Sequence, residues 1–186
     1  MCSSGTNTQP WEVAVVSGKR KEELSNILYE MSKSGVARNP DIQSPEAWPH
    51  EMDIRAKKRG EKRLKILGIK RDDQQRRKEL GLSNYEFYGA PCVLFLFMDS
   101  ALSSWSIFDM GLMAQSIILA AHSFGLGSCI QALICNYPDA IRKYLEIPKT
   151  KLLVVGISMG YPALEARINT YQSDRNNLGD FAWWYP

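Results

Sequence analysis

The chain has 186 residues, of which 45 % are hydrophobic and 23 % are charged, and its formal net charge is +3. This balance argues against a disordered chain or a fibrous repeat, and the length fits one domain with a substantial core over residues 1–186. No basic region followed by an apolar stretch opens the sequence, and no small-residue cleavage site follows, which favours the cytoplasm over secretion.

The first part of the chain predicts a strand, a helix and a loop. Residues 11–17 (WEVAVVS) are rich in valine and follow a Ser/Thr/Asn/Gly segment, which predicts a β-strand after an ordered loop. Apolar side chains recur at helical spacing within residues 19–33, and Gly35 is a plausible stop for this amphipathic helix. Three prolines within residues 39–49 predict a loop.

Residues 50–82 are highly charged and predict two surface helices hinged near Gly68 and Ile69. Twelve basic and three acidic residues lie between Arg55 and Lys78. Such a block could attract nucleic acid or the phosphates of a pyridine nucleotide. No nucleic-acid motif accompanies it, so a solvated helical face is the simpler interpretation and no nucleic-acid partner is expected. Both a mobile cover and an ordinary exposed excursion would have this polarity.

Two continuous apolar runs predict the centre of a sheet. Residues 92–98 (CVLFLFM) and 152–159 (LLVVGISM) have the pattern of strands buried on both faces. Between them, residues 104–124 predict a long helix that packs against the sheet and against another helix or subunit; polar residues interrupt it, so no membrane span is expected. Residues 137–145 predict a short helix. Helices alternating with few buried strands predict an α/β or α+β sandwich.

Side chains that usually carry catalysis or bind metals are scarce. The four cysteines show neither a C-x-x-C pair nor zinc-like spacing, so we expect no metal site, and Cys92 and Cys129 are interpreted as buried thiols in a reducing compartment. Nucleophile-elbow, zincin and P-loop motifs are absent, so no catalytic side chain is expected. Residues 125–128 (GLGS) lack the third glycine of a dinucleotide fingerprint and follow a helix, which favours a helix C-terminal turn.

Five segments nevertheless occur in an order that resembles the FMN-dependent nitroreductases. They are the loop 3–11 (SSGTNTQPW), the GAP sequence 89–91, the GLGSC turn 125–129, the GYP sequence 160–162, and Arg175 before an aromatic tail. The resemblance covers nearly the whole chain. It implies an α+β fold (an α/β sandwich) with a mixed, mainly antiparallel sheet flanked by helices, a helical excursion at about residues 50–82 and an extended C-terminal tail. Four aromatic residues near the C-terminus are expected to dock, with a partner subunit as one candidate surface.

What the resemblance implies for function is a single FMN-binding domain over residues 1–186 that forms a homodimer, with FMN sites at the subunit interface. NAD(P)H, the co-substrate, would reduce flavin N5, and a nitroaromatic, quinone or similar small-molecule acceptor would then take the electrons in a ping-pong reaction. The flavin carries this chemistry, so the protein needs to contribute only binding and orientation.

The resemblance also implies which residues hold the cofactor. The loop would reach the isoalloxazine ring, the segment after the glycine-rich turn would bring backbone amides to flavin N5 and O4, a polar residue before the first central strand would approach the pyrimidine edge, and an arginine would grip the phosphate. The loop residues are Ser3, Ser4, Gly5 and Asn7, and the residues after the turn are Ile130, Gln131 and Ala132. The residue at the pyrimidine edge is Asn84, and the phosphate-binding arginine is Arg175. Two simpler alternatives stay open: Gln131 as a buried residue bonded to local backbone, and Arg175 in a surface ion pair with Asp174 or Asp180.

One departure from the family pattern concerns the phosphate. Family members carry an Arg-rich R-S-x-R segment that also binds it, and the present sequence begins downstream of where that segment would lie. Loss of its charge-assisted contacts would weaken FMN binding. Two alternatives to the nitroreductase activity follow: a non-catalytic homologue with weak or no FMN binding, and a different flavin reaction, such as that of the dehalogenase branch, with the 50–82 excursion as a substrate lid.

Overall fold

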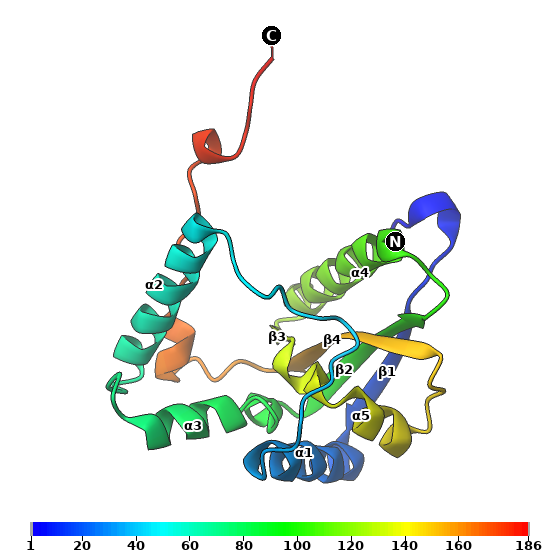
Figure 1. Ribbon diagram of the computed structural model, residues 1–186, viewed down its shortest axis with the longest axis horizontal. Helices are drawn as coiled ribbons and strands as arrows, with labels where there is room; N and C mark the ends of the chain where they lie inside the picture. The colour runs from blue at the N-terminus through cyan, green and yellow to red at the C-terminus, as the bar shows by residue number, and fades with distance from the viewer. Residues whose placement is uncertain (1, 186) are drawn as a thin grey trace. The chain divides into compact units, whose positions relative to one another are not determined.

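The computed structural model describes residues 2–185, which form an α+β structure (Figure 1). The chain divides into two compact units. The first, here called the sheet unit, comprises residues up to 45 and residues 75–162. The second, here called the tail unit, comprises residues 46–74 and residues from 163 onward.

The sheet unit is built on four strands, all paired antiparallel in the order β1-β2-β4-β3. The two continuous apolar runs of the sequence form the central strands β2 and β4, as predicted, because a strand with neighbours on both sides and helices on both faces meets little water. Their bounds are Cys92–Asp99 for β2 and Lys151–Gly160 for β4, while β1 is Glu12–Ser17 and β3 is Gly127–Gln131.

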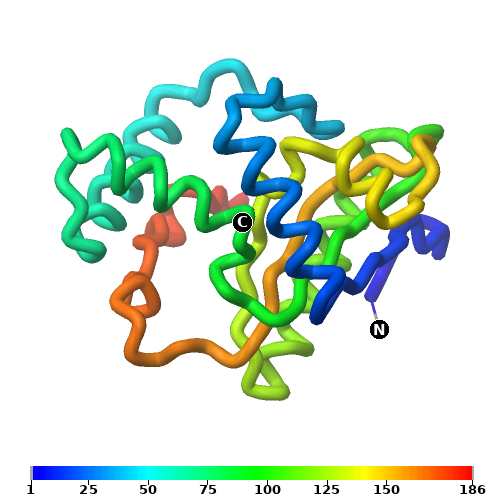
Figure 2. The backbone as a smooth tube through the Cα atoms, turned by 90° about the horizontal axis from the view of Figure 1, so that it is seen from below, coloured from blue at the N-terminus to red at the C-terminus, as the bar shows by residue number. Residues whose placement is uncertain are grey.

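One face of the sheet is covered by α1 (Gly18–Lys33) and α5 (Pro138–Leu145), which lie side by side in Figures 1 and 2. Because side chains alternate along a strand, Val93, Phe95 and Phe97 of β2 all point to this face, where they join the larger of two hydrophobic cores. Helix α1 was predicted from its apolar spacing and α5 from its Pro138-Asp139 opening, and both begin within one residue of the predicted bounds.

The other face is covered by α4 (Ser104–Ser123). Leu96 and Met98 of β2 alternate to this side and pack with Met110 of α4 in the second core. Among the described residues, α4 is the one helix that is long and apolar enough to cross a membrane by length and composition. One side of it packs along β2, β3 and β4, while most of its residues stay exposed or half-buried.

A β-bulge in β4 adjusts which residues reach each core. Leu96 lies opposite Val155, but the next residue, Phe97, lies opposite Leu153, so Val154 has no partner on β2. The extra residue shifts the alternation. Leu153 therefore joins the α1/α5 core, whereas Val154 and Val155 both pack in the α4 core.

Strand β3 was not predicted from the sequence. Gly125 has φ +75 and closes α4 as a helix C-terminal turn, as expected, but the chain then continues as an edge strand. The first four residues of β3 are only half-buried or exposed, so their sequence carries no apolar alternation. The interpretation of Cys129 as a buried thiol is wrong for the same reason: it lies exposed on this edge, while Cys92 is half-buried and Cys135 is the buried cysteine.

The charged excursion consists of α2 (His50–Ile66) and α3 (Gln74–Leu82), joined by a turn in which Gly68 has φ +64. This agrees with the predicted pair of surface helices and with the hinge near Gly68, and α2 contains no buried residue. After β4 the chain is irregular apart from two short 3₁₀ turns. The tail aromatics Phe181, Trp183, Trp184 and Tyr185 are exposed, so their predicted docking is not made on the described chain.

Candidate functional site

The loop that precedes β1 is held in place by a buried carboxylate. The backbone N–H of Gly5 donates to both carboxylate oxygens of Asp109, at 3.1 and 3.2 Å, and Asp109 lies on α4 with only 7 % of its surface exposed. Within the loop, the Gln9 N–H donates to the Ser4 hydroxyl at 3.1 Å. The sequence reading missed Asp109, although a lone acidic residue inside an apolar helix was the available signal.

Three non-glycine residues of this loop adopt left-handed backbone conformations. Thr6, Asn7 and Gln9 have φ values of 47, 58 and 48. Each costs roughly 1 kcal/mol or more for a residue with a Cβ, and such conformations persist only where surrounding contacts impose them, often at ligand sites. The bonds to Asp109 and Ser4 supply that constraint. The loop thus presents the exposed Ser3 and Asn7 side chains on a fixed backbone.

A buried network of polar side chains links Asn84 to β3 and β4. The Gln131 amide donates to the Asn84 carbonyl at 3.0 Å, and its oxygen accepts a hydrogen bond from the Ser158 hydroxyl. The Asn84 amide donates to the Gly81 carbonyl at 3.1 Å and its oxygen accepts from the Tyr88 hydroxyl at 2.6 Å. The structure therefore brings together two of the residues singled out from the sequence, and their side chains are largely occupied by each other and by their neighbours.

Segment 130–132 consequently offers a ligand its backbone and small apolar surfaces. Ile130 and Ala132 are exposed, whereas Gln131 is buried. Because β3 is an edge strand paired only with β4, alternate backbone groups along its outer side point away from the sheet. A planar, hydrogen-bonding ligand could bind along this edge through backbone amides.

Three of the glycine and proline motifs converge at one end of the sheet. Gly127 lies opposite Gly160 in the β3/β4 register. A Cβ on Gly160 would lie 2.5 Å from Pro91 Cδ, and one on Gly127 would lie 3.3 Å from the Cβ of Pro162. The GAP, GLGS and GYP motifs therefore share a packing reason: prolines from two segments rest on glycines of β3 and β4, where a larger side chain would displace them.

The loop and segment 130–132 lie at opposite edges of the sheet. The loop leads into β1, at one edge, and residues 130–132 end β3, at the other (Figure 1). Three strand spacings of about 4.8 Å separate the two edges, roughly 14 Å before any offset along the strands. One copy of the chain therefore does not bring these two groups of residues together.

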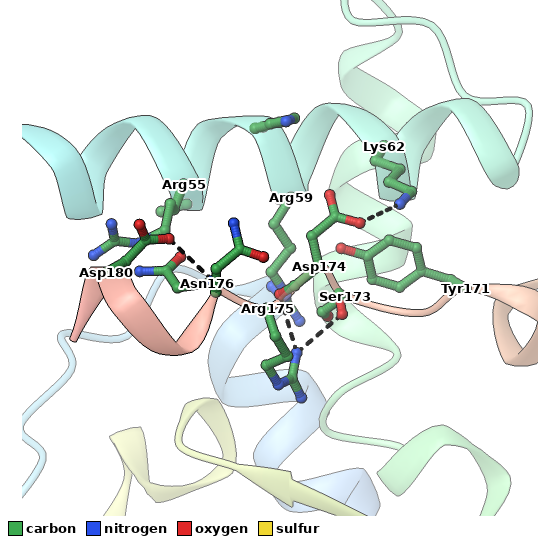
Figure 3. Close-up of a pocket in the computed structure, with 12 residues that line it drawn as sticks. Arg55, Arg59, Lys62, Tyr171, Ser173, Asp174, Arg175, Asn176 and Asp180 are labelled. Atoms are coloured by element: carbon green, nitrogen blue, oxygen red, sulfur yellow. Dashed lines mark hydrogen bonds and ion pairs between the residues drawn. The ribbon is translucent and has the colours of Figure 1, made fainter. Parts of the chain in front are cut away.

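Arg175 lies in the tail unit, where it lines a pocket of about 400 Å³ between α2 and residues 171–180 (Figure 3). Its guanidinium donates to the carbonyls of Ser173 and Asp174, at 3.0 and 3.2 Å. The alternative ion pairs with Asp174 and Asp180 are not formed: Asp174 binds Lys62 at 3.0 Å, and Asp180 accepts the Asn177 N–H at 3.0 Å.

The pocket is rich in positive charge. Arg55, Lys58, Arg59 and Lys62 line it from α2 and Arg175 from the tail, against the carboxylates of Asp174 and Asp180. The hydrogen bond from Lys62, and then its charge, hold the pKa of Asp174 below the usual value, with a smaller contribution from Lys58. An anion that enters this pocket thus meets several cations.

The chain is similar to known proteins in both sequence and fold. A sequence model described as the nitroreductase family matches residues 1–161. The chain is 33 % identical to a 4-nitrobenzoate reductase of Pseudomonas putida, over 97 % of this chain and 79 % of that protein. It is 32 % identical to the nitroreductase NfnB of Mycolicibacterium smegmatis, over 95 % of this chain and 75 % of that protein.

Solved structures give the same result for the fold. The FMN-dependent nitroreductase NfnB from Mycobacterium smegmatis, solved in complex with NADPH, superposes with a TM-score of 0.94 at 31 % identity, over 100 % of this chain and 83 % of the other. An FMN- and NADPH-dependent NfnB from a Sphingopyxis strain superposes with a TM-score of 0.95 at 29 % identity, over 100 % of this chain and 84 % of that one.

Proposed function

The chain belongs to the nitroreductase family, and we propose that it is an FMN-dependent oxidoreductase that uses NAD(P)H to reduce nitroaromatic compounds, with quinones as further candidate acceptors. The single observation that carries this proposal is the superposition of the whole chain on an FMN-dependent nitroreductase with a TM-score of 0.94 at 31 % identity. The relatives named for their substrates act on nitrobenzoate and nitrobenzene, which supports a nitroaromatic acceptor.

The residues present fit FMN by the chemistry of their donors. The loop exposes the Ser3 hydroxyl and the Asn7 amide on a fixed backbone, which suits the carbonyls and nitrogens of a flavin ring. The edge at residues 130–132 offers backbone N–H groups, and the tail unit offers the Arg175 guanidinium for a phosphate. We propose these three groups as the cofactor-binding residues.

Asn84 and Gln131 have a supporting role in this proposal. Their amides hold each other, Ser158 and Tyr88 in a buried network, so they fix the course of segment 130–132 beside the cofactor. When bound, FMN would take a hydride from NAD(P)H and pass electrons to the acceptor in a second half-reaction. The protein's residues bind and orient the reactants, and none needs to act as a nucleophile.

The active form that we propose is a homodimer with FMN at the subunit interface. The loop and segment 130–132 lie at opposite sheet edges, so a site that uses both draws them from two copies. The outer side of α4 supports this arrangement because it exposes Trp105, Phe108, Leu112 and Leu119, an apolar surface that a second copy would cover.

The same proposal treats residues 1–186 as one functional domain in the cytoplasm. The superposed nitroreductases cover all of the chain, with residues of the sheet unit and the tail unit alike. Helix α4 packs along the sheet on one side and would contact a partner copy on the other. In this arrangement its apolar residues are covered by protein on both sides, without a membrane.

The purified protein tests the proposal through its cofactor. We expect a visible flavin spectrum, or a rise in melting temperature on addition of FMN that chloride at equal ionic strength does not produce. With FMN bound, NADPH should be consumed in the presence of 4-nitrobenzoate. Colourless protein with no FMN-induced stabilisation would contradict the proposal and favour a non-catalytic homologue.

A further inference from the structure

Four cations of α2 lie on one face of the helix. Arg55, Lys58, Arg59 and Lys62 follow the spacing i, i+3, i+4, i+7, which places their side chains along a single stripe. All four line the pocket of the tail unit, and Arg175 lines it from the opposite wall. Like charges at these spacings repel one another and destabilise an isolated helix, so the stripe is not explained by the needs of the helix.

Most of this charge has no counterion within the protein. Lys62 pairs with Asp174, but among the described residues Arg55, Lys58 and Arg59 form no ion pair. By contrast Lys57, which points off the stripe, is paired with Asp53 at 2.6 Å in an ordinary i,i+4 bridge. The helix therefore pairs a cation outside the pocket and leaves three inside it without an ion pair, although the charge of Lys58 also acts on Asp174.

The arrangement of donors suits a phosphate. Figure 3 shows Arg59 reaching from α2 toward the segment of Ser173 and Arg175, while Lys62 is turned to Asp174. Guanidinium groups suit the three oxygens of a phosphomonoester, which carries close to two negative charges near neutral pH. In Figure 3 the Arg175 guanidinium is turned away from α2, toward the carbonyls of Ser173 and Asp174. The volume of about 400 Å³ lies within the usual range of about 300–1,000 Å³ for small-molecule sites.

We propose that Arg55, Lys58 and Arg59 of α2 form, together with Arg175, a binding site for a phosphomonoester dianion. The inference rests on the proposed function, because that function supplies two ligands with this group: the 5′-phosphate of FMN and the 2′-phosphate of NADPH. The site extends phosphate recognition from the tail arginine to α2, and it makes α2 a ligand-binding element rather than a solvated face.

The double variant Arg55→Gln/Arg59→Gln tests the site, with Lys57→Gln as the matched control on the same helix. Four affinities are measured on the flavin-loaded or flavin-titrated protein: those for FMN and riboflavin, and those for NADPH and NADH. We expect the double variant to lose about tenfold or more in affinity for one phosphorylated ligand, because charge-assisted bonds are removed. Its affinity for the unphosphorylated counterpart of that ligand should stay near the wild-type value. All four affinities of Lys57→Gln should also stay near the wild-type values.

This experiment distinguishes the two possible ligands, the 5′-phosphate of FMN and the 2′-phosphate of NADPH. A loss for FMN but not riboflavin assigns the pocket to the flavin phosphate, and a loss for NADPH but not NADH assigns it to the 2′-phosphate. Equal losses for the phosphorylated and unphosphorylated ligands, or no loss beyond that of Lys57→Gln, would overturn the site.

A second measurement does not depend on activity. Inorganic phosphate should raise the melting temperature of the wild type more than chloride at equal ionic strength, and this difference should vanish in the double variant. Without phosphate, the double variant should melt at or above the wild-type temperature, since it relieves like-charge repulsion. Phosphate stabilisation in a protein that fails every flavin test would leave the site standing and contradict only the proposed function. Equal phosphate stabilisation of wild type and double variant would overturn the site.

Discussion

Single residues with no place in the sequence motifs hold the candidate site together. Asp109 is the clearest case, because its carboxylate accepts the Gly5 N–H from a loop more than a hundred residues earlier in the chain. Without that bond, the left-handed conformations of Thr6 and Asn7 have little to support them. We therefore assign Asp109 a positioning role for the loop.

Asp109→Asn tests this role. The variant keeps one acceptor for the Gly5 N–H but loses the negative charge, and its new amide N–H faces a donor. We expect FMN affinity to fall by about tenfold, the difference between a charge-assisted and a neutral hydrogen bond. Fluorescence titration with FMN measures the change. Glu30→Gln is the control, since this exposed carboxylate pairs with Lys33 on α1, which covers the other face of the sheet; equal FMN affinity in Asp109→Asn and wild type would contradict the positioning role.

A second carboxylate stabilises the sheet unit. Asp41 accepts hydrogen bonds from the Arg142 guanidinium and, at 2.7 Å, from the Leu153 N–H, and its side chain is 12 % exposed. Asp139 binds the same guanidinium at 2.9 Å but is 68 % exposed. We predict that Asp41→Asn lowers the free energy of unfolding by about 3 kcal/mol or more, because it leaves Arg142 buried without its main counterion.

Asp139→Asn serves as the matched comparison and should cost less than about 1 kcal/mol at neutral pH. The hydrogen bond from Arg142 holds the pKa of Asp139 below its usual value. Its small contribution is therefore present above the unfolded pKa and disappears as pH falls through the folded one. Urea unfolding measures both variants. Equal losses of stability would show that burial does not distinguish the two carboxylates.

Burial also determines the behaviour of Cys135. Desolvation raises the pKa of its thiol to about 12. The folded state then holds the proton at pH values where the unfolded state releases it, so the contribution of Cys135 to stability is full below about pH 9 and declines as pH rises toward 12. We expect the stability advantage of wild type over Cys135→Ala in urea unfolding to shrink between pH 8 and pH 10.5, about the range in which an ordinary thiol titrates. A constant or growing difference would contradict this assignment.

At the scale of elements, the sequence predicted the strands that are buried and missed the edge strand that is exposed. Residues 92–98 and 152–159 were identified as central strands because water is excluded from both faces. Strand β3 has one neighbouring strand and mostly exposed side chains, so nothing in GSCIQ alternates. Edge strands are fixed by backbone pairing, which leaves little trace in side-chain pattern.

The site could be predicted only in part for a related reason. The loop, the glycine motifs and Arg175 were proposed from the resemblance, but the residues that they contact were not predicted. The Gly5–Asp109 bond and the Gln131–Asn84 bond join residues 104 and 47 positions apart, and a tertiary pairing of this kind has no local signature. Gln131 illustrates the ambiguity, because a buried amide and a ligand contact have the same sequence pattern.

Helix α4 is the element on which the dimer proposal depends. Leu119 is 60 % exposed on its outer side, and Leu119→Glu would place a charge in the proposed interface, where an unpaired carboxylate is costly. We expect the wild type to sediment as a dimer and the variant as a monomer with weakened FMN binding. The control is Leu164→Glu, a leucine in the tail unit that is 77 % exposed. A monomeric wild type would contradict the dimer.

At the scale of the whole molecule, the sheet unit and the tail unit each carry residues that the proposed function uses. The sheet unit carries the loop and the 130–132 edge, which suit a flavin ring, and the tail unit carries a cationic pocket, which suits a phosphate. In the proposed function the protein contributes binding and orientation, and FMN would supply the redox chemistry when bound.

Anaerobic titration of the FMN-loaded protein tests this central claim most directly. We predict that NADPH bleaches the visible flavin absorbance in the absence of an acceptor, and that 4-nitrobenzoate or a related nitroaromatic, added after NADPH has been exhausted, restores it. This order of events requires two separate half-reactions at one flavin. Bound flavin that NADPH does not bleach, or bleached flavin that no nitroaromatic or quinone reoxidises, would contradict the account.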